Sequence, residues 1–389
     1  MRRLAIVTTH PIQYYAPIFQ LLHQRGVISI KVFYTWGESS VNKFDPGFNK
    51  TINWDIPLTE GYPFEWVTNT STDPGSHHFK GIVNPGLNKQ IKQFSPDAIL
   101  FFGWAYNSHL KAMRYFKNKV PVYFRGDSTL LDERKNVKSV LRTILLKWVY
   151  SHVDSAFYTG TNNKAYFKKF GLKDSQLSFA PHAIDNARFS VDRHNEAKTL
   201  RDDIGLSADD LLIVFAGKFE EKKDPGLLLT AFAQQKKSNW HLLFVGNGPL
   251  EDELKRRAQN SANIHFMDAC NQSYMPVVYQ AADLFCLPSK GPGETWGLAI
   301  NEAMACGKAI LASDKVGCAI DLVKENYNGA TFANGDSNDL SKKLDELTRS
   351  PEKLKMYGLN SLKLIDDWNF VNIAIAIEST LQHEKKRQD

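Results

Sequence analysis

The stretch "LLIVFAGKFEEKKDPGLLLTAFAQQKKSNWHLLFVGNG", residues 211–248, carries the clearest indication of the fold. Residues 211–216 and 240–245 are short apolar runs, typical of strands that are buried on both faces. Between them, "PGLLLTAFAQQ" (225–235) has the composition and length of a helix that begins at a proline. A strand, a helix and a strand in this order predict a parallel β-α-β unit.

The same alternation extends over the rest of the chain. In the second half, further apolar runs are predicted as strands at 264–268, 283–289, 309–313 and 329–333. The first half carries apolar runs of the same kind at 2–10, 28–36, 97–103 and 120–126. Because strands that alternate with helices form parallel sheets, an α/β fold with two doubly wound domains is expected.

The domain boundaries follow from length and charge. A chain of 389 residues exceeds what one hydrophobic core usually supports. The charged segment 192–210 reads as a linker with a short helix, so we place a first domain at 1–195 and a second at 196–367. The final helix, at about 368–389, is expected to join the first domain. Residues 38–79, rich in Gly, Pro, Asn and aromatics, predict long loops and short edge strands that line a cleft.

Composition excludes several classes of protein. An apolar content of 43% and a charged content of 23% are those of a soluble globular protein, and no apolar run is long enough to span a membrane. The apolar run at the N-terminus is too short for a secretory signal. The four cysteines form no C-x-x-C pair, and three of them lie in apolar contexts that suit buried free thiols, so a cytoplasmic location is expected. The net charge of +6 is scattered, whereas a nucleic-acid surface needs clustered cations among aromatics.

Two loops after strands of the second half carry residues suited to a phosphorylated ligand. Lys218 follows Gly217 at the end of a strand, and Lys223 comes five residues later, so the two lysines are able to neutralise a diphosphate. The alternative is a solvated turn without a ligand, in which nearby glutamates neutralise the charge of the lysines. Gly246 and Gly248 form a glycine turn after the next strand, which without a full G-x-G-x-x-G is a weak dinucleotide signal.

The segment "GETWGLAINEAMACG", residues 293–307, predicts a loop that enters a helix ending at a glycine. Glu294 falls in the loop and Glu302 one to two turns inside the helix. A helix N-terminus is a seat for phosphate, and a carboxylate accepts two hydrogen bonds from a sugar diol. Two acids on a helix are more often solvated surface, but all these loops share the edge of one sheet.

In this order, "GKFEEKK", "FVGNGPLEDEL", "FMDACNQSYMPVVYQAADLFCLPS", "GETWGLAINEAMACGKAILAS" and "NGATFANGD" resemble the successive landmarks of the family 4 retaining glycosyltransferases. The resemblance covers about residues 210–340 well and the first half loosely. It implies the GT-B fold, in which two Rossmann-like domains face each other across an interdomain cleft. The Glu-x7-Glu spacing of Glu294 and Glu302 is that family's signature.

The resemblance also implies roles for named residues. Glu294 would contact the donor sugar near the reacting carbon as a catalytic residue, and Glu302 would hold the ribose. The diphosphate would meet Lys218, Lys223 and the backbone amides of Thr295, Trp296, Gly297 and Leu298. The base would lie against Ala269 and Cys270, with the glycine loops at Gly217, Gly246 and Gly248 completing the donor side.

The first half departs from that family's pattern. Where many relatives have a histidine that positions the donor sugar, this chain has Arg125, which suits a phosphate or an anionic acceptor but is no neutral base. A salt bridge between Arg125 and Asp127 is the structural alternative. On the acceptor side we place His10, Gln13, Tyr14 and Asp127, although His10 also fits as a cap of the following turn.

Residues 135–150, "KNVKSVLRTILLKWVY", predict a basic amphipathic helix. One stripe holds Val137, Val140, Leu141, Ile144, Leu145 and Trp148, while Lys138, Arg142 and Lys147 lie off it. We favour a helix that packs this stripe on the sheet with its cations solvated. The alternative is a peripheral contact with the inner face of a membrane.

The expected activity is transfer of a sugar from an NDP-sugar, foremost a UDP-sugar, to an acceptor hydroxyl in polysaccharide or glycolipid assembly. No resident cofactor or metal is expected, because D-x-D, H-E-x-x-H and C-x-x-C are absent and the adjacent His77 and His78 suit one metal poorly. The partners are then the donor and a saccharide or lipid-linked saccharide, without nucleic acid. The alternatives are a GT-B sugar-nucleotide epimerase or hydrolase and a nicotinamide-dependent Rossmann dehydrogenase.

Overall fold

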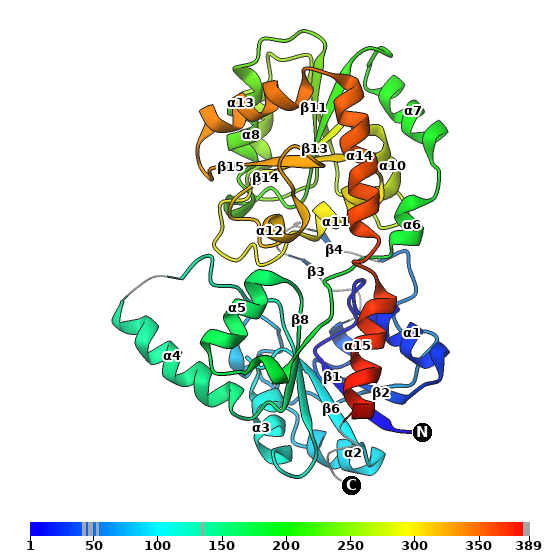
Figure 1. Cartoon of the computed structure of the whole chain (residues 1–389), viewed down its shortest axis with the longest axis vertical. Coiled ribbons are helices and arrows are strands. Elements are labelled where there is room, and N and C mark those ends of the chain that lie inside the picture. The colour runs from blue at the N-terminus through cyan, green and yellow to red at the C-terminus, as the bar shows by residue number, and fades with distance from the viewer. Residues whose placement is uncertain (41–43, 46–49, 52–53, 134–135, 384–389) are drawn as a thin grey trace. The chain divides into compact units, whose positions relative to one another are not determined.

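The computed structural model describes residues 1–40, 44–45, 50–51, 54–133 and 136–383 (Figure 1). The chain divides into two compact units. Unit 1 comprises Met1–Lys43, Pro57–His182 and Phe370–Asp389, and unit 2 comprises Phe44–Ile56 and Ala183–Asn369. Among the described residues, no helix is long and apolar enough to cross a membrane.

Unit 1 is built on a seven-stranded parallel sheet with the order β5-β2-β1-β6-β7-β8-β9. Its strands are β1 (Arg3–Thr8), β2 (Ser29–Tyr34), β5 (Phe64–Trp66), β6 (Ala98–Phe102), β7 (Val122–Arg125), β8 (Ser155–Tyr158) and β9 (Leu177–Phe179). Its helices are α1 (Ala16–Arg25), α2 (Leu87–Phe94), α3 (Asn107–Phe116), α4 (Val137–Tyr150), α5 (Thr161–Lys169) and α15 (Phe370–His383), with short 3-10 turns at η1 (Glu38–Ser40), η2 (Phe79–Gly81) and η3 (Asp174–Gln176). The central strands β1 and β6 are almost wholly buried, because apolar side chains cover both faces.

The last helix of the chain, α15, belongs to unit 1. Both oxygens of the Glu378 carboxylate accept from the Arg25 guanidinium of α1 at 2.9 Å, and Thr380 pairs with Ser178 of β9 at 3.2 Å. Ile373, Ala374, Ile377 and Leu381 form its buried face. Residues 384–389 of the expected helix lie outside the described residues.

Unit 2 is built on a six-stranded parallel sheet with the order β12-β11-β10-β13-β14-β15. Its strands are β10 (Leu211–Ala216), β11 (Trp240–Val245), β12 (Ile264–Met267), β13 (Leu284–Leu287), β14 (Ala309–Ser313) and β15 (Gly329–Phe332). Its helices are α6 (Asn186–Ser190), α7 (His194–Asp203), α8 (Pro225–Ala233), α9 (Glu251–Ala258), α10 (Met275–Ala281), α11 (Leu298–Ala305), α12 (Ala319–Leu322), α13 (Ser337–Thr348) and α14 (Pro351–Ile365), with a 3-10 turn at η4 (Glu221–Lys223). The predicted β-α-β unit at 211–248 is β10, α8 and β11, whose strands pair in parallel.

The boundary between the two units lies earlier in the chain than the predicted boundary between residues 195 and 196. Residues 183–195 lie in unit 2, where the Arg193 amide donates to the Gln280 side chain of α10 at 2.8 Å. The charged stretch 192–210 contains α7, which buries Ala197 and Leu200 and pairs Arg201 with Asp283 at 3.0 Å. Alternating charges on its outer face therefore mark a solvated helix rather than a free linker.

Residues 38–79 contain η1, β5 and the antiparallel strand pair of β3 (Phe44–Asp45) and β4 (Lys50–Thr51). β5 is an edge strand, as expected. Residues 54–56 are attached to unit 2, where the Asp55 amide donates to the Asn271 side chain at 3.3 Å and the Asp55 carboxylate accepts from the Ser273 hydroxyl. Positions 41–43, 46–49 and 52–53 of this predicted loop region lie outside the described residues.

Candidate functional site

The strand order of each sheet reverses at one point, and the loops there hold the predicted residues. In unit 2 the reversal lies between β10 and β13, whose carboxyl ends continue into the loops 217–224 and 288–297. Open parallel sheets bind ligands outside the carboxyl ends of the strands at this switch point. Gly217, Lys218, Lys223 and Glu294 are therefore brought to one edge of one sheet.

Glu294 is held by a lysine and a serine. The Lys223 ammonium forms an ion pair with Glu294 Oε2, and the Ser289 hydroxyl donates to the same oxygen at 2.8 Å. The Glu294 side chain is 7% exposed and that of Lys223 is 17% exposed. A shielded carboxylate needs such partners, because a buried charge without them is costly.

The loop that carries Lys223 is also fastened to the loop that carries Glu294. The Lys290 amide donates to the Lys222 carbonyl at 2.9 Å, and the Lys290 ammonium lies 2.8 Å from a Glu221 oxygen. Ser289 is in turn held by β14, since the Ser313 hydroxyl donates to its carbonyl oxygen. The ion pair thus joins two loops whose backbones are already connected.

The glycines of the turn after β11 are needed for close packing. A Cβ atom at Gly246 would lie 1.9 Å from the Gly217 carbonyl oxygen, and one at Gly248 would lie 2.6 Å from the Phe219 oxygen. The turn therefore packs directly on the lysine loop. Between the two glycines, the buried Asn247 side chain donates to Asp268 at 2.9 Å and accepts from the Ala269 amide at 3.0 Å. Asn247 thereby positions the segment at Ala269 and Cys270.

The helix α11 begins at a glycine in a left-handed conformation. Gly297, the N-cap, has a φ of 97°, and an added Cβ would meet Val316 at 2.8 Å. The preceding residues are held by a second loop, because the Gly317 amide donates to the Glu294 carbonyl at 3.2 Å and the Cys318 amide to the Trp296 carbonyl at 2.9 Å. The turn at 294–297 is therefore fixed before the helix starts.

Within α11, Glu302 is buried at 4% exposure and accepts a hydrogen bond from the Tyr279 hydroxyl at 2.7 Å. Trp296 is also buried, and its indole nitrogen donates to the Asn301 side chain at 2.9 Å. Thr295 and Leu298 are half-buried at the same turn. The two glutamates of the Glu-x7-Glu pair are thus both largely withdrawn from water, whereas acids on a solvated surface helix would be exposed.

Sequence reasoning missed the residues that hold these acids. Ser289 and Tyr279 are the hydrogen-bond donors to Glu294 and Glu302, and Asn247 orders the Ala269 segment. For two of them position was a signal, since Ser289 lies just after β13 and Asn247 lies between two glycines of the turn after β11. Cys270, predicted beside the base, is half-buried, and burial raises the pKa of its thiol to about 11.

In unit 1 the Arg125 side chain forms hydrogen bonds with backbone carbonyl groups. It is buried at 2% exposure and donates to the Ala180 and Pro181 carbonyl oxygens, both at 2.8 Å. Burial lowers the pKa of Arg125 to about 10, against the charge of Asp127, so the guanidinium stays charged at neutral pH. The structure therefore assigns Arg125 a bracing contact that sequence reasoning did not foresee.

His182 and Tyr15 lie in the same part of unit 1 as Arg125 and were not predicted. The two rings stack with centroids 6.5 Å apart, and burial lowers the pKa of His182 to about 4 although Asp127 opposes this shift. His182 is thus neutral at pH 7. Its position after the strand β9 is the signal that sequence reasoning passed over.

Three of the residues predicted on the acceptor side, His10, Gln13 and Tyr14, lie after β1, at the switch point of unit 1, where the strand order reverses between β1 and β6, whereas Asp127 follows β7. His10 Nδ1 forms a hydrogen bond with Thr9 Oγ1 at 2.8 Å, and the His10 ring packs edge-on against Trp36, with ring centroids 5.2 Å apart. Gln13 and Tyr14 follow, half-buried, in the turn before α1.

A group of possible metal ligands lies in the loop between β5 and η2 of unit 1. Among the described residues, Asp73, His77 and His78 in unit 1 offer ligand atoms within 4.8 Å of one another. Asp73 and His77 are exposed, and His78 Nε2 lies 3.2 Å from the Asp73 carboxylate. Adjacency of the two histidines gave no hint that an aspartate joins them.

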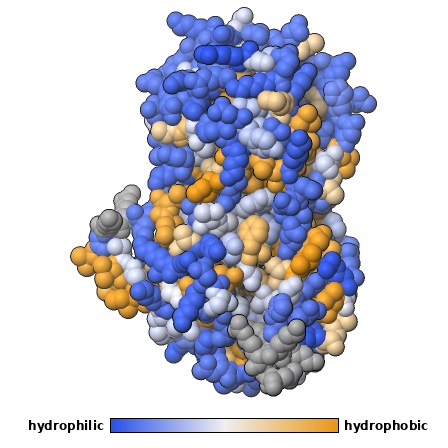
Figure 2. Space-filling view, in the orientation of Figure 1, coloured by the Kyte–Doolittle hydropathy of each residue, from blue (hydrophilic) through white to orange (hydrophobic). Residues whose placement is uncertain are grey.

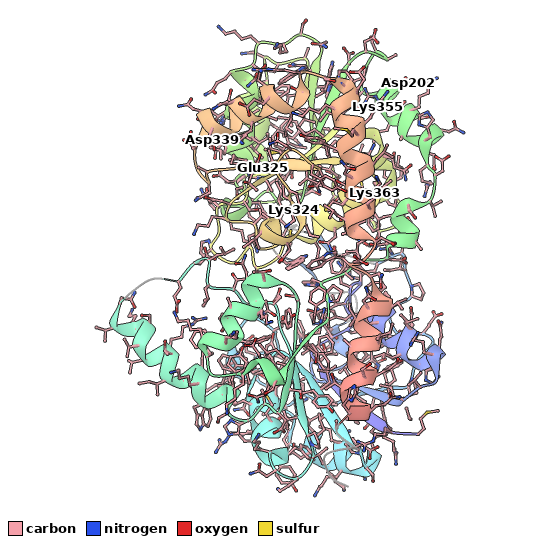
Figure 3. All side chains as sticks on the ribbon, in the orientation of Figure 1. Asp202, Lys324, Glu325, Asp339, Lys355 and Lys363 are labelled. Atoms are coloured by element: carbon pink, nitrogen blue, oxygen red, sulfur yellow. The ribbon has the colours of Figure 1, made fainter. Side chains whose placement is uncertain are left out.

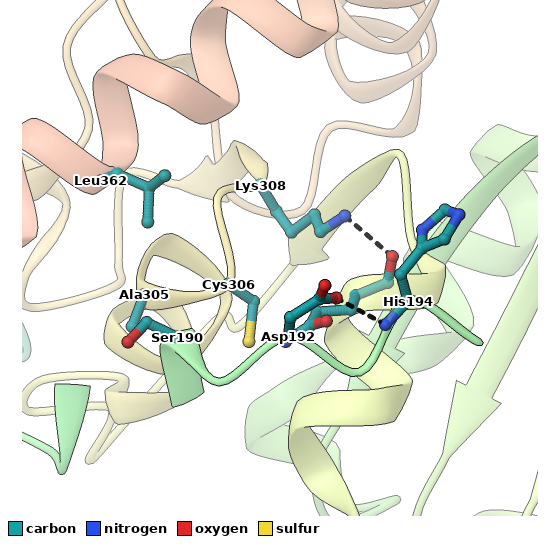
Figure 4. Close-up of a pocket in the computed structure, with 8 residues that line it drawn as sticks. Ser190, Asp192, His194, Ala305, Cys306, Lys308 and Leu362 are labelled. Atoms are coloured by element: carbon teal, nitrogen blue, oxygen red, sulfur yellow. Dashed lines mark hydrogen bonds between the residues drawn. The ribbon is translucent and has the colours of Figure 1, made fainter. Parts of the chain in front are cut away.

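A pocket of about 330 Å³ lies at the opposite edge of the unit 2 sheet (Figure 4). It is lined by Asp192, His194, Cys306 and Lys308, and Lys308 immediately precedes β14. The Lys308 ammonium donates to the Gln280 carbonyl at 2.9 Å. This pocket therefore does not include the lysine and glutamate pair at the carboxyl edge.

Charges on the outside of unit 2 are mixed in sign. Figure 3 labels Lys324, Glu325, Asp339 and Lys355 on its helices and loops, with acids and bases interspersed. Glu325, for example, pairs with Lys343 at 3.4 Å.

Comparison with known proteins identifies part of the chain. Residues 196–363 match the family described as glycosyl transferases group 1. The D-inositol 3-phosphate glycosyltransferase 2 of Catenulispora acidiphila is 26% identical over 208 residues, or 50% of this chain and 47% of that protein. The phosphatidyl-myo-inositol mannosyltransferase of Mycobacterium tuberculosis is 30% identical over 105 residues, or 26% of this chain and 28% of that protein. The chain spans half or less of the length of these two curated relatives.

Solved structures match the chain along nearly its whole length. The crystal structure of Anabaena Alr3699/HepE with UDP and glucose has a TM-score of 0.71 and 18% identity, over 98% of this chain and 100% of that one. At this identity the likeness establishes the fold. The expected GT-B fold, with two Rossmann-like domains on parallel sheets, is confirmed.

Proposed function

We propose that the chain is a retaining glycosyltransferase that uses a UDP-sugar, because residues 196–363 match the family of glycosyl transferases group 1. The observation that carries the proposal is the shielded Glu294, held by Lys223 and Ser289 at the switch point of unit 2. Such a carboxylate is placed to accept hydrogen bonds from sugar hydroxyls. The solved HepE complex with UDP and glucose supports the choice of donor.

The donor would bind with its diphosphate at the turn before α11. Lys223 and Lys218 supply positive charge there, and the N-terminus of α11 adds a favourable dipole. Glu302, already hydrogen-bonded to Tyr279, would accept from the ribose hydroxyls, and the base would lie against Ala269 and Cys270. The family that this chain resembles usually has an arginine where Lys218 stands, and a lysine there gives charge without a bidentate fork.

In the proposed reaction, the acceptor oxygen bonds to the anomeric carbon on the face from which the diphosphate leaves. The bond between that carbon and the phosphate oxygen breaks, and the acceptor proton passes to the departing diphosphate. The protein then contributes positioning and charge stabilisation, and no resident metal is assigned a part. Arg125, braced on two carbonyls, would shape the acceptor side rather than exchange a proton.

The proposed acceptor is a saccharide or lipid-linked saccharide of polysaccharide or glycolipid assembly, handled in the cytoplasm. The curated mannosyltransferase named for phosphatidyl-myo-inositol supports a lipid acceptor. The test is incubation of the protein with a panel of nucleotide sugars, with and without lipid-linked saccharides, followed by mass spectrometry. Sugar transfer from a UDP-sugar is expected. Isomerisation, release of free sugar alone, or no turnover with the whole panel would contradict the proposal.

A further inference from the structure

The apolar stripe of α4 faces outward, which corrects the expectation that it packs on the sheet. Its six residues have relative solvent exposures between 41% and 79%: Val137, Val140, Leu141, Ile144, Leu145 and Trp148. Figure 2 shows apolar side chains gathered on the outer side of this helix. Isolated exposed apolar residues are ordinary, but a continuous patch marks an interaction surface.

A different face attaches α4 to unit 1. Leu146, Val149 and Tyr150 are buried in the core, and the Tyr150 ring packs edge-on against Phe124 and Phe167. The helix begins at a capping box in which the Asn136 side chain accepts from the Ser139 amide at 2.9 Å. The helix is therefore anchored and capped without the outward stripe, so the stripe is not needed to hold it in place.

Cations lie along both edges of the stripe. At 3.6 residues per turn, the stripe covers roughly 140° of the helix, with Lys138 next to Leu145 at one edge and Lys147 next to Val140 at the other. Both lysines are exposed, and α4 contains no acidic residue. Arg142 is turned toward the domain, where its guanidinium lies 5.8 Å from the centre of the Tyr166 ring. Lys135, also predicted in this helix, lies outside the described residues.

A further cation and a tryptophan lie at the C-terminal end of the stripe. The Arg114 guanidinium of α3 is 5.4 Å from the centre of the Trp148 ring. Tryptophan is favoured at the boundary between lipid headgroups and acyl chains, where its ring is partly apolar and its N–H remains near water. The surface thus combines an apolar centre, lysine edges and an interfacial aromatic residue.

We propose that α4 docks unit 1 on the surface of a bilayer that contains anionic lipid. The apolar stripe enters the headgroup boundary, while Lys138 and Lys147 contact the phosphates at either side. A second copy of the chain fits less well, because lysine is depleted in protein interfaces and two such faces would bring like charges together. The docking does not depend on the sugar transfer, so it is tested separately.

The test is flotation of the full chain with vesicles of phosphatidylcholine containing about 30% phosphatidylglycerol. The test variant L141Q/I144Q changes two stripe residues that are 65% and 62% exposed, so we expect the fold to be retained. The control M356Q/L359Q changes two residues of α14 that are 50% and 60% exposed. We expect the bound fraction of L141Q/I144Q to be at least tenfold lower than that of the wild type. The wild type should show the same loss on vesicles of pure phosphatidylcholine, and the control should bind like the wild type.

Three outcomes would overturn the proposal. The first is wild-type protein that does not float with anionic vesicles. The second is an equal loss of binding in the M356Q/L359Q control, which would place the contact elsewhere. The third is a dimer, measured by light scattering, that L141Q/I144Q dissociates while lipid binding persists. Circular dichroism of each variant establishes that it is folded.

Discussion

Replacing Lys223 by methionine tests the ion pair at the carboxyl edge of unit 2. Methionine keeps much of the lysine stem but removes the ammonium that faces Glu294. The two side chains are 17% and 7% exposed, so water cannot fully replace the lost partner. Breaking a buried ion pair from one side costs about 3–5 kcal/mol, and the partial exposure of Lys223 places K223M near the lower end, at about 3 kcal/mol.

The assay is thermal unfolding of unit 2 within the full chain. For a domain of roughly 200 residues, 1 kcal/mol moves Tm by about 2–4 °C, so K223M is expected to lower Tm by about 6–12 °C. In K223M/E294Q no unpaired charge remains, and the glutamine keeps an oxygen for the Ser289 hydroxyl. The double variant should therefore unfold at a higher temperature than K223M.

The control is K222M, because Lys222 is 40% exposed and pairs with Glu220 in the same turn. Exposed pairs contribute about 0–1 kcal/mol, so its Tm should change by no more than about 4 °C. The reasoning is refuted if the coupling energy between K223M and E294Q is below about 0.5 kcal/mol, the range of independent sites. It is equally refuted if K222M destabilises the protein as much as K223M.

Two further predictions concern packing and pH. G246A places a methyl group 1.9 Å from the Gly217 oxygen and should lower both Tm and UDP affinity. The control G205A has open space around the added atom and should change Tm alone. Equal UDP affinity in the two variants would count against the packing of the glycine turn on the lysine loop. Burial lowers the pKa of His109 to about 4, below its unfolded value near 6.5, so its contribution is present above pH 6.5 and is lost as the pH falls to 4, with about 2 kcal/mol lost by pH 5. Urea unfolding at pH 7 and pH 5 checks this, and an H109Q variant with an unchanged pH dependence would contradict it.

The strands and the location of the donor side were accessible from the sequence for a physical reason. Parallel strands are buried on both faces, so they appear as short apolar runs, and their order along the chain fixes which loops share an edge. Lys223 and Glu294 could therefore be placed together although 71 positions separate them. The Glu-x7-Glu spacing added the roles through resemblance, which strand patterns alone do not provide.

The partners of these residues were not accessible in the same way. Ser289 and Tyr279 are ordinary residues in sequence, and only the folded chain brings their hydroxyls to Glu294 and Glu302. Arg125 gave no sign of its two carbonyl partners. The helix α4 is apolar on two faces, and periodicity identifies apolar stripes without saying which one the domain buries.

The most direct test of the central claim is the reaction of E294Q with the donor found in the nucleotide-sugar panel. Glutamine keeps the size of Glu294 and removes its charge, so UDP-sugar affinity should stay within about threefold while the transfer rate falls at least 100-fold, the scale of a lost transition-state contact. The product of the wild-type enzyme should carry the anomeric configuration of the donor, as measured by NMR. Normal turnover in E294Q would contradict the assignment of Glu294 to the reacting sugar.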